Sequence, residues 1–217
     1  MLYIVSTPIG NLKDITLRAI EVLKSVDLIA AEDTRHTRIL TRHYDINTPL
    51  TSYFEHNKFK KAEHLLKLLN EGKEIALVSD AGTPGISDPG YRLVQLVQKH
   101  NIPVTVIPGP CAAVAALSLS GLPTDRFFFG GFLPVKSAAR RKRLAELKEG
   151  AGTVIFYESP HRLLKALQDI ADVLNDPRVV VAREVTKKFE ESREGKASEL
   201  VEYFSRAKPR GEFVILL

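Results

Sequence analysis

Glu74-Ile75-Ala76-Leu77-Val78-Ser79 decides the fold, together with Asp80-Ala81-Gly82-Thr83-Pro84-Gly85, which follows it directly. The first segment has the length and the apolar centre of a buried strand. The second contains two glycines and a proline, as loops do, and an amphipathic helix is predicted after it at Tyr91–Lys99. Strand, loop and helix in this order are the unit from which helix-covered sheets are built.

The same order recurs through the first half of the chain. Strands are predicted at Leu2–Ser6, Asp27–Ala31, Thr48–Tyr53, Glu74–Ser79 and Val104–Ile107. Helices are predicted at Thr16–Lys24, Arg35–Tyr44, Lys58–Asn70, Tyr91–Lys99 and Cys111–Ser120. Regular alternation of strands and helices predicts a mostly parallel sheet that is covered on both faces.

The polar stretch Ser120–Asp125 contains Gly and Pro, and it predicts a boundary between an N-terminal α/β domain, 1–120, and a C-terminal α/β domain, 125–217. In the second domain, strands are predicted at Phe127–Phe132, Thr153–Glu158, Arg178–Glu184, Phe189–Lys196 and Glu212–Leu217. Helices are predicted through the basic run to Lys148, at His161–Leu174 and at Ala197–Phe204. The fold class is therefore α/β, with two small α/β domains, the second built on a mixed sheet, and the phenylalanines at 127–129 are expected in its core.

The charge balance favours a polyanionic partner. The 217 residues include 31 Lys and Arg against 26 Asp and Glu, a formal net charge of +5. Two clusters stand out, namely Arg35, His36, Arg38, Arg42 and His43, and Lys136, Arg140, Arg141, Lys142 and Arg143. Each cluster is either a phosphate-binding surface for RNA or a solvated helix face. We expect the second cluster to contact phosphates, and the first to take that role if the second does not.

Other features of the sequence bear on compartment and metal use. No apolar run reaches the roughly 20 residues that span a bilayer, and the N-terminus enters a predicted strand without a signal segment. The single Cys111 excludes an internal disulfide and leaves no cysteine cluster for zinc. We therefore expect a cytoplasmic protein without a metal site.

Two loops at predicted strand ends are candidates for ligand binding. The Ser79–Gly90 loop is unusually rich in Gly and Pro, so its backbone is able to approach a ligand closely, and Asp88 is placed to cap the next helix. The Ile107–Ala113 loop consists mainly of small residues before a helix start, which suits either a flat ligand or close helix packing. Neither a Walker loop nor a Gly-x-Gly-x-x-Gly follows the first strand, which argues against ATP and nicotinamide cofactors.

Five motifs together resemble a known family. They are Ser6-Thr7-Pro8-Ile9-Gly10-Asn11-Leu12, Ala31-Glu32-Asp33-Thr34-Arg35, the Ser79–Gly90 loop, Pro108-Gly109-Pro110, and Phe156-Tyr157-Glu158-Ser159-Pro160-His161-Arg162. In this order, over essentially the whole chain, they resemble the ribosomal RNA small subunit methyltransferase I family of the tetrapyrrole methylase superfamily.

The resemblance implies a homodimer with S-adenosylmethionine in an interdomain cleft, which 2′-O-methylates the ribose of a cytidine in small-subunit (16S) ribosomal RNA. The cofactor-binding residues that it implies are Pro8, Asp80, Ala81, Gly82, Thr83, Cys111, Ala112, Phe156 and Tyr157. Many members of this branch continue beyond the last strand, whereas this sequence ends at Leu217, so we expect any RNA-binding role of such an extension to be either absent or supplied elsewhere.

A ribose hydroxyl becomes a good nucleophile only when its proton is able to leave, so a general base is needed, and no metal is required. Glu32 and Asp33 end the second predicted strand and are the first candidates, with Arg35 as a phosphate contact. Alternatively, Asp33 merely caps the following helix. Glu158, with His161, is the second candidate.

Two other functions stay open at this point. Tetrapyrrole-modifying relatives typically carry Gly-x-Gly-Pro-Gly-Asp in the first loop, whereas this chain has Ser6-Thr7-Pro8-Ile9-Gly10-Asn11. A small-molecule, tetrapyrrole-type S-adenosylmethionine methyltransferase is therefore the second choice. A noncatalytic RNA-binding module is the third.

Overall fold

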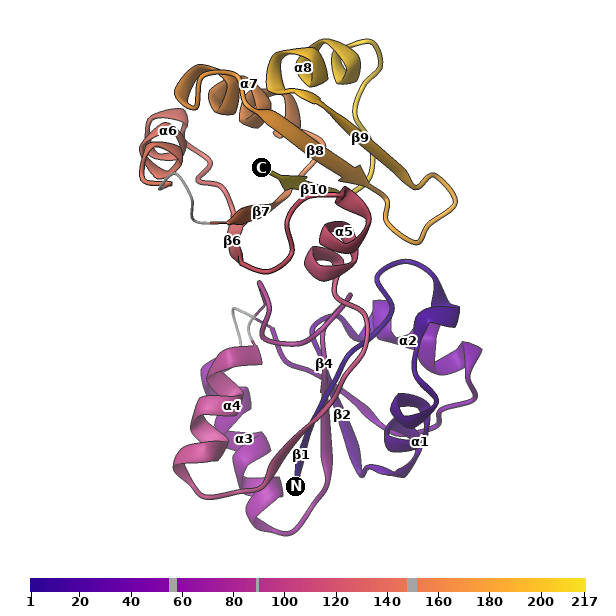
Figure 1. The fold of residues 1–217 in the computed structure, drawn as a ribbon. Coiled ribbons are helices and arrows are strands. Elements are labelled where there is room, and N and C mark those ends of the chain that lie inside the picture. Colours follow the sequence, from indigo (N-terminus) through magenta and orange to yellow (C-terminus); the bar gives the residue numbers. More distant parts are fainter. Residues whose placement is uncertain (55–57, 89, 148–151) are drawn as a thin grey trace. The chain divides into compact units, whose positions relative to one another are not determined.

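The computed structural model describes residues 1–54, 58–88, 90–147 and 152–217. It divides into two compact units, Met1–Cys111 and Ala112–Leu217 (Figure 1). Helix α5 (Ala112–Ser120) packs within the second unit, so the division falls before this helix, whereas the boundary expected at 120–125 falls after it.

The first unit is built on a parallel five-stranded sheet. Its strands are β1 (Leu2–Val5), β2 (Leu28–Ala31), β3 (Leu50–Ser52), β4 (Ile75–Val78) and β5 (Val104–Ile107). Their order is β3-β2-β4-β1-β5, and every neighbouring pair is parallel. All five strands were predicted, and β5 has the predicted bounds. All strands of this sheet therefore end at the same edge.

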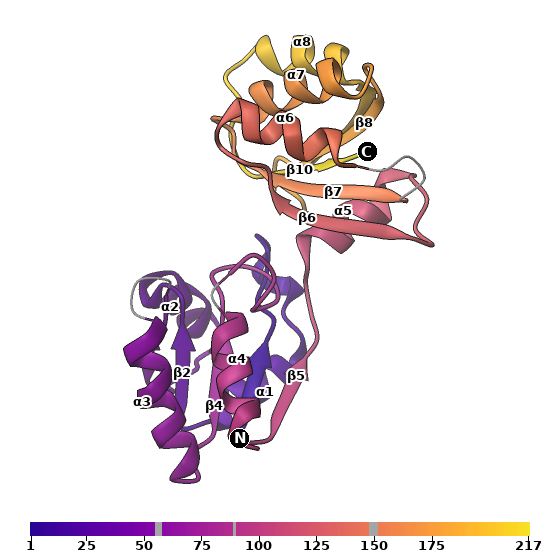
Figure 2. The ribbon, with the colours of Figure 1, turned by 90° about the vertical axis from the view of Figure 1, so that its left-hand side faces the viewer.

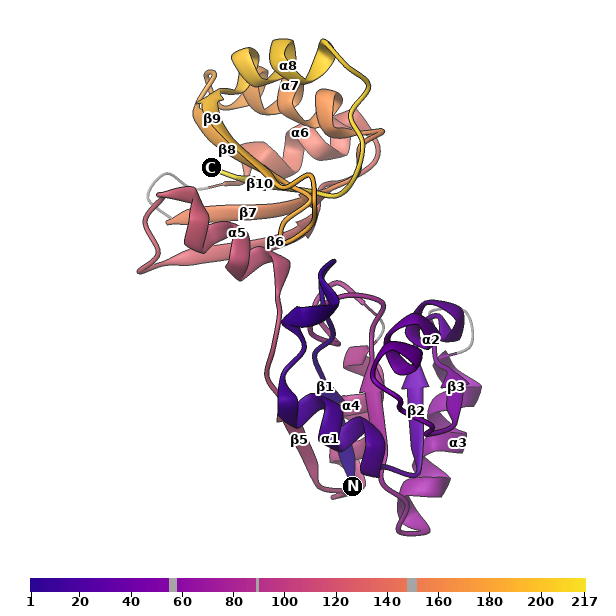
Figure 3. The same cartoon turned by 90° about the vertical axis from the view of Figure 1, so that its right-hand side faces the viewer.

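Helices cover both faces of the first sheet. They are α1 (Leu17–Ser25), α2 (Thr34–His43), α3 (Lys58–Asn70) and α4 (Gly90–Lys99), and a short 3-10 turn, η1, spans Leu12–Asp14. Alternate strand residues enter two separate cores, so Ile29 packs with α1 and α2 while Ala30 packs with α3 and α4. Figure 3 shows α1 and α2 on the side that faces the viewer. Two covered faces explain the continuously apolar strands.

The second unit contains a mixed sheet. Its strands are β6 (Phe127–Phe132), β7 (Thr153–Glu158), β8 (Arg178–Arg183), β9 (Glu191–Lys196) and β10 (Phe213–Leu216). Their order is β6-β7-β10-β8-β9, and only β6 and β7 are parallel. Helices α6 (Ser137–Ala145), α7 (Leu163–Val173) and α8 (Ala197–Ser205) cover one face, and α5 contacts the other (Figure 2). The predicted mixed sheet is confirmed.

Three details of the second unit differ from the sequence predictions. Helix α6 ends at Ala145, and Lys148, where it was predicted to end, lies outside the described residues. Phe127 and Phe128 are 48% and 42% exposed, so the prediction that they lie in the core is wrong. The reason is that β6 is an edge strand with only β7 beside it. Helix α7 begins at Leu163, two residues later than predicted.

None of the helices in the described part of the chain is long and apolar enough to cross a membrane.

Candidate functional site

Three loops at the carboxyl edge of the first sheet are joined by hydrogen bonds. Because β1 lies between β4 and β5, the loops that follow these strands meet. Thr7 and Gly82 exchange two backbone hydrogen bonds, with N···O distances of 2.9 and 3.0 Å. The Thr7 hydroxyl also donates to the Ser79 carbonyl at 3.1 Å. The first and second loops therefore form one rigid structure.

The third loop is attached through two hydroxyl groups. Thr83 Oγ1 donates to the Pro110 carbonyl at 3.2 Å, and it lies 2.9 Å from Ser6 Oγ. Since the single Thr83 proton is already used, Ser6 donates to Thr83. Close approach also requires Gly109, because a Cβ there would lie 2.9 Å from Ser6 Cβ. Three of the five family-like motifs, those that begin at Ser6, Ser79 and Pro108, thus meet at one place in the first unit.

The Ser79–Gly90 loop is shaped by left-handed glycines and a carboxylate. Gly82 and Gly85 have φ angles of +82° and +91°, which disfavour any other residue. Asp88 Oδ1 accepts hydrogen bonds from the Gly85 amide at 2.5 Å and the Gly90 amide at 2.9 Å. Gly90 begins α4, so the predicted capping role of Asp88 is confirmed.

Glu32, Asp33 and Asp80 form a chain of carboxylates at the same edge. The Asp33 amide donates to Asp80 Oδ1 at 2.9 Å, and the Asp80 amide contacts Glu32 Oε2 at 3.4 Å. These residues follow β2 and β4, which are neighbours in the sheet. The sequence predicted Glu32 and Asp33 as one group and Asp80 as part of another, and the fold joins the two.

The pKa values of the two adjacent acids are shifted in opposite directions. Asp33 caps α2 by accepting from the Arg35 amide at 2.8 Å, and it pairs with the Arg35 guanidinium at 2.6 Å. This side-chain hydrogen bond, together with the amide, lowers the pKa of Asp33. Burial raises the pKa of Glu32, and the nearby Asp80 and Asp88 add to the rise, against the opposing effect of the Asp80 amide. Glu32 is therefore the stronger proton acceptor of the two.

The predicted cofactor residues of the first unit fall into two groups. Pro8 and Gly82 are buried and shape the loops. Ala81 is exposed, and Asp80, Thr83 and Cys111 are partly exposed, so these are open to a ligand.

In the second unit, Tyr157 and Phe156 point to opposite faces of the sheet. The Tyr157 hydroxyl accepts from the Ala113 amide at 3.1 Å, next to the partly exposed Ala112 that begins α5. Phe156 is fully buried beneath α6 and α7 and packs against Gly130, where a Cβ would come within 2.2 Å of the ring. The Phe156 side chain is therefore unable to contact a ligand on the other face of the sheet.

The contacts of Glu158 indicate a structural role for its side chain. Its side chain is fully buried, its Oε1 accepts from the Ser159 amide at 2.7 Å, and its Oε2 pairs with Arg162 at 3.1 Å. Burial raises its pKa, although Ser159, Arg162 and Arg140 oppose that shift. Arg162 also donates to the Leu133 carbonyl. With both oxygens occupied, Glu158 is less well placed than Glu32 to accept a substrate proton.

The basic run on α6 is only in part the free surface that the sequence suggested, because Lys136 and Lys142 are exposed while its three arginines are paired. Arg140 is only 3% exposed, and its Nη2 and Nε lie 2.6 and 2.7 Å from Asp169 Oδ2, while its Nη1 donates to two backbone carbonyls. Arg141 pairs with Asp169 and Asp172, and Arg143 contacts Glu146 at 3.5 Å. For Arg140 the expectation is wrong, because a guanidinium buried against a carboxylate is unable to reach RNA.

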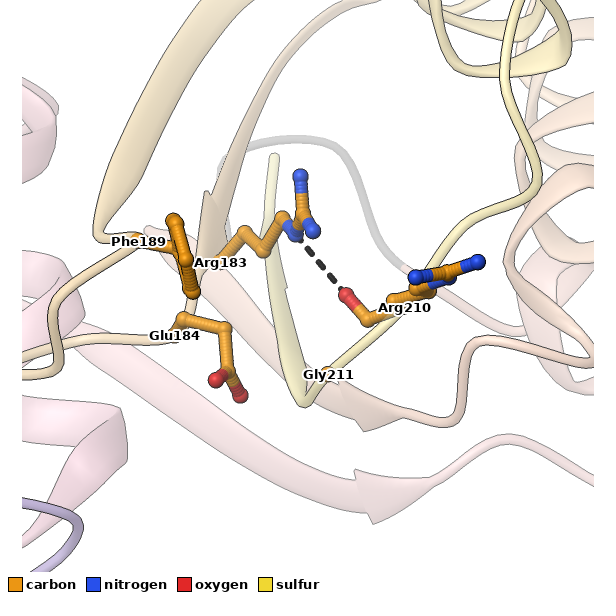
Figure 4. Close-up of a pocket in the computed structure, with 5 residues that line it drawn as sticks. All are labelled: Arg183, Glu184, Phe189, Arg210 and Gly211. Carbon is orange, nitrogen blue, oxygen red and sulfur yellow. Dashed lines mark hydrogen bonds between the residues drawn. The ribbon is translucent and has the colours of Figure 1, made fainter.

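A pocket that the sequence did not indicate lies in the second unit, with a volume of about 270 Å³ (Figure 4). It is lined by Arg183, Glu184, Phe189, Arg210 and Gly211. Arg183 Nε donates to the Arg210 carbonyl at 2.8 Å, and Glu184 pairs with Lys187 at 2.9 Å. Arg183 and Glu184 are thus already partnered by the protein, and the pocket shares no residue with the predicted site.

The sequence analysis gave no site role to Ser6 or Thr7, which hold the loops together. The available signal was their place directly after the first predicted strand, where side chains of a parallel sheet gather.

Comparison with known proteins identifies relatives of this chain. A family model for Tetrapyrrole (Corrin/Porphyrin) Methylases matches residues 1–201. The chain is 54% identical over 219 residues to the Ribosomal RNA small subunit methyltransferase I of Escherichia coli O157:H7, covering all of this chain and 77% of that protein. It is 48% identical to the protein of the same name from Thermotoga maritima, covering all of this chain and 97% of that protein.

Among solved structures, the uroporphyrin-III C-methyltransferase of Thermus thermophilus, complexed with S-adenosylhomocysteine, has the same fold. The TM-score is 0.67 at 19% identity, over 99% of this chain and 96% of that chain. The matching family model and the full-length relatives lead to one conclusion: the chain belongs to the tetrapyrrole methylase family.

Proposed function

We propose that this protein transfers the methyl group of S-adenosylmethionine to a ribose 2′-hydroxyl of a cytidine in small-subunit ribosomal RNA. The observation that carries the proposal is 54% and 48% identity, over the whole chain, to proteins named for methylation of this RNA. That identity is far above the 19% found for a structure with which only the fold is shared. With an rRNA substrate, we expect the activity in the cytoplasm.

The tetrapyrrole alternative is not favoured. The full-length relatives are named for RNA, and the first loop of this chain reads Ser6-Thr7-Pro8-Ile9-Gly10-Asn11 in place of Gly-x-Gly-Pro-Gly-Asp. A noncatalytic module is also not favoured, since the same relatives are named methyltransferases.

The carboxyl edge of the first sheet fits S-adenosylmethionine in its chemistry. Asp80 offers carboxylate oxygens that accept hydrogen bonds from ribose hydroxyls, and it is not fully buried. Beside it, Ala81 is exposed and small, so a flat group is able to lie against backbone. At Gly109 the absence of a side chain permits the close loop contact on which this surface depends. We propose that Asp80, Ala81 and Thr83 contact the cofactor.

When bound, S-adenosylmethionine supplies an electrophilic methyl group on a sulfonium whose leaving group is a neutral thioether. The chain's own residues then have two tasks. Glu32, the acid with the raised pKa, accepts the hydroxyl proton as the new oxygen–carbon bond forms and the carbon–sulfur bond breaks. Arg35, whose side chain is 86% exposed, is positioned to bind an RNA phosphate.

A methyl-transfer assay with alternative acceptors tests the function. Purified protein and radiolabelled S-adenosylmethionine are incubated with unmodified small subunits, with naked small-subunit rRNA, or with a porphyrinoid. We expect label in RNA, and we expect the labelled nucleotide to resist alkaline hydrolysis of its 3′ linkage because the 2′-oxygen is blocked. Label in the porphyrinoid alone would overturn the proposal.

The cofactor position is tested by Thr83→Arg. A long cationic side chain at this partly exposed position should fill the space beside Ala81, so we expect calorimetry to show weaker S-adenosylmethionine binding. The Thr83 hydroxyl also holds the loops together, so Thr83→Val is the matched control that removes the hydroxyl without adding bulk. Unchanged affinity in a folded Thr83→Arg protein would exclude this loop from the site.

We also propose that the protein is a homodimer. Strand β6 is the edge of its sheet, and Phe127, Phe128 and Phe132 on this strand are each more than 40% exposed. An apolar edge strand is a surface that proteins ordinarily cover. A second copy of the chain is the partner that the family resemblance implies.

A further inference from the structure

Helix α2 carries an exposed basic face with no acidic residue. Its sequence, Thr34–His43, contains no Asp or Glu, and the buried positions are Thr37, Leu40 and Thr41. The outer positions are occupied by Arg35, His36, Arg38, Arg42 and His43, all of them at least partly exposed. We call these five residues the α2 basic face.

The pairing of this face differs from that of the α6 run. On α6, the arginines at 140, 141 and 143 each have a carboxylate partner. On α2, Arg35 pairs with Asp33, whereas Arg38 and Arg42 make no ion pair within the described residues. The two unpaired guanidinium groups are therefore free to bind an anion.

Helix stability does not account for these arginines. Arg38 and Arg42 are four residues apart, and Arg35 and Arg38 are three apart, so like charges face each other along the helix and destabilise it. Arg35 also lies in the first turn, where the helix dipole disfavours a cation, whereas Arg42 lies in the last turn, where the dipole favours one. Repulsion between like charges on a helix that contains no Asp or Glu calls for a functional explanation.

The position of the face suits the RNA substrate. Helix α2 begins directly after Glu32 and Asp33, so Arg38 lies one turn and Arg42 two turns along the helix that leads away from the proposed base. Figure 3 shows α2 beside β2, near the edge at which the strands of this sheet end. An RNA strand whose ribose reaches Glu32 would bring neighbouring phosphates to this helix.

We propose that the α2 basic face binds phosphates of the substrate RNA through Arg38 and Arg42, and thereby positions the ribose at the carboxyl edge of the sheet. This inference rests on the proposed function. Phosphate contacts carry position and affinity but no base sequence. Both arginines are therefore positioning residues and not catalytic ones.

The test compares the salt dependence of RNA binding in three variants of the full chain. The variants are Arg38→Gln/Arg42→Gln, the charge-conserving Arg38→Lys/Arg42→Lys, and Lys24→Gln/Lys99→Gln. Lys24 and Lys99 are exposed and lie in the last turns of α1 and α4, so the control removes two charges from the opposite edge of the same unit. The probe is small-subunit rRNA transcribed in vitro, which lacks modifications.

We expect Arg38→Gln/Arg42→Gln to weaken binding and to flatten the slope of log affinity against log salt by about 1.4 to 1.8, or about 0.7 to 0.9 for each phosphate that is no longer bound. KM for RNA should rise, while S-adenosylmethionine affinity and thermal stability should not fall. The lysine variant should keep the slope, and the Lys24/Lys99 control should behave as the unmodified protein does.

An unchanged slope, or an equal weakening in the Lys24/Lys99 control, would overturn the assignment of this face while leaving the proposed function intact. An unmodified protein that neither binds nor methylates rRNA would instead overturn both.

Discussion

At the scale of single residues, the site depends on two neighbouring acids with opposite shifts. Asp33 is held ionised by Arg35 and by the first turn of α2, and such a carboxylate is a poor proton acceptor. Glu32, half-buried beside Asp80, binds a proton more readily. One position in sequence thus separates a helix cap from a candidate base.

Replacing Glu32 by Gln tests this assignment. Gln keeps an oxygen that is able to accept from the Asp80 amide, so the loops should stay in place, but it is unable to take a proton. We expect kcat for RNA methylation to fall by roughly 10²- to 10⁴-fold, with cofactor affinity by calorimetry little changed. Asp33→Asn should cause a smaller loss, and a larger one would reverse the assignment.

The raised pKa of Glu32 also predicts two pH dependences. Activity should rise with pH as Glu32 loses its proton, with a midpoint above that of an ordinary Glu, and Glu32→Gln should abolish this rise. The contribution of Glu32 to the free energy of unfolding has the opposite pH dependence and falls as pH rises. Between the unfolded and folded pKa values only the folded state keeps the proton, so the stability contributed by this group is full below the unfolded pKa and is lost as pH rises through the folded pKa.

Urea unfolding at a series of pH values measures the second effect. The Glu32→Gln protein should lack this component of the decline. If the free energy of unfolding depends on pH in the same way in the unmodified and Glu32→Gln proteins, Glu32 has the same pKa in the folded and unfolded states.

At the scale of elements, local pattern predicted nearly every helix and strand, because apolar runs and Gly/Pro loops are local signals. The strand order was not predicted, since β1 pairs with β4 and β5, which lie more than 70 residues away in the chain. The backbone hydrogen bonds between Thr7 and Gly82 were not predicted for the same reason. The loops of the site could therefore be predicted from sequence, but their joining could not.

The α6 helix also shows that local sequence does not reveal contacts with distant segments of the chain. Nothing local distinguishes Arg140 from Arg141 or Lys142, yet Arg140 alone is buried, and its partner Asp169 lies on α7. A run of cations that the sequence suggests is one surface is in fact split by the fold into an internal ion pair and a solvated face.

Arg140→Gln should accordingly destabilise the second unit. Removing one partner of a buried pair leaves Asp169 uncompensated, so we expect a loss of about 3–5 kcal/mol in the free energy of unfolding. Lys142→Gln, which changes a nearby charge with far less burial, is the matched control and should change it by less than about 0.5 kcal/mol. Chemical denaturation monitors both. If Arg140→Gln has the same free energy of unfolding as the unmodified protein, the ion pair makes no net contribution to stability.

At the scale of the whole molecule, the exposed phenylalanines of β6 predict self-association. Light scattering at micromolar concentration should give about twice the 24.1 kDa chain mass. Phe127→Lys places a charge on the 48% exposed edge position and should shift the mass toward the monomer. The control Lys165→Phe leaves that edge intact and should not change the measured mass. A monomeric unmodified protein would contradict the proposal.

Strand β10 lies between β7 and β8, at the centre of the second sheet, although it is formed by residues 213–216. During synthesis on the ribosome, the first unit has all its strands once residue 107 has emerged, whereas the second has a gap at its centre until the last strand arrives. For about 100 residues of elongation, a folded unit would therefore precede an incomplete sheet, and the facing edges of β7 and β8 stay unpaired until β10 arrives. Nascent chains halted before residue 213 should be cut by protease after the first unit and not within it.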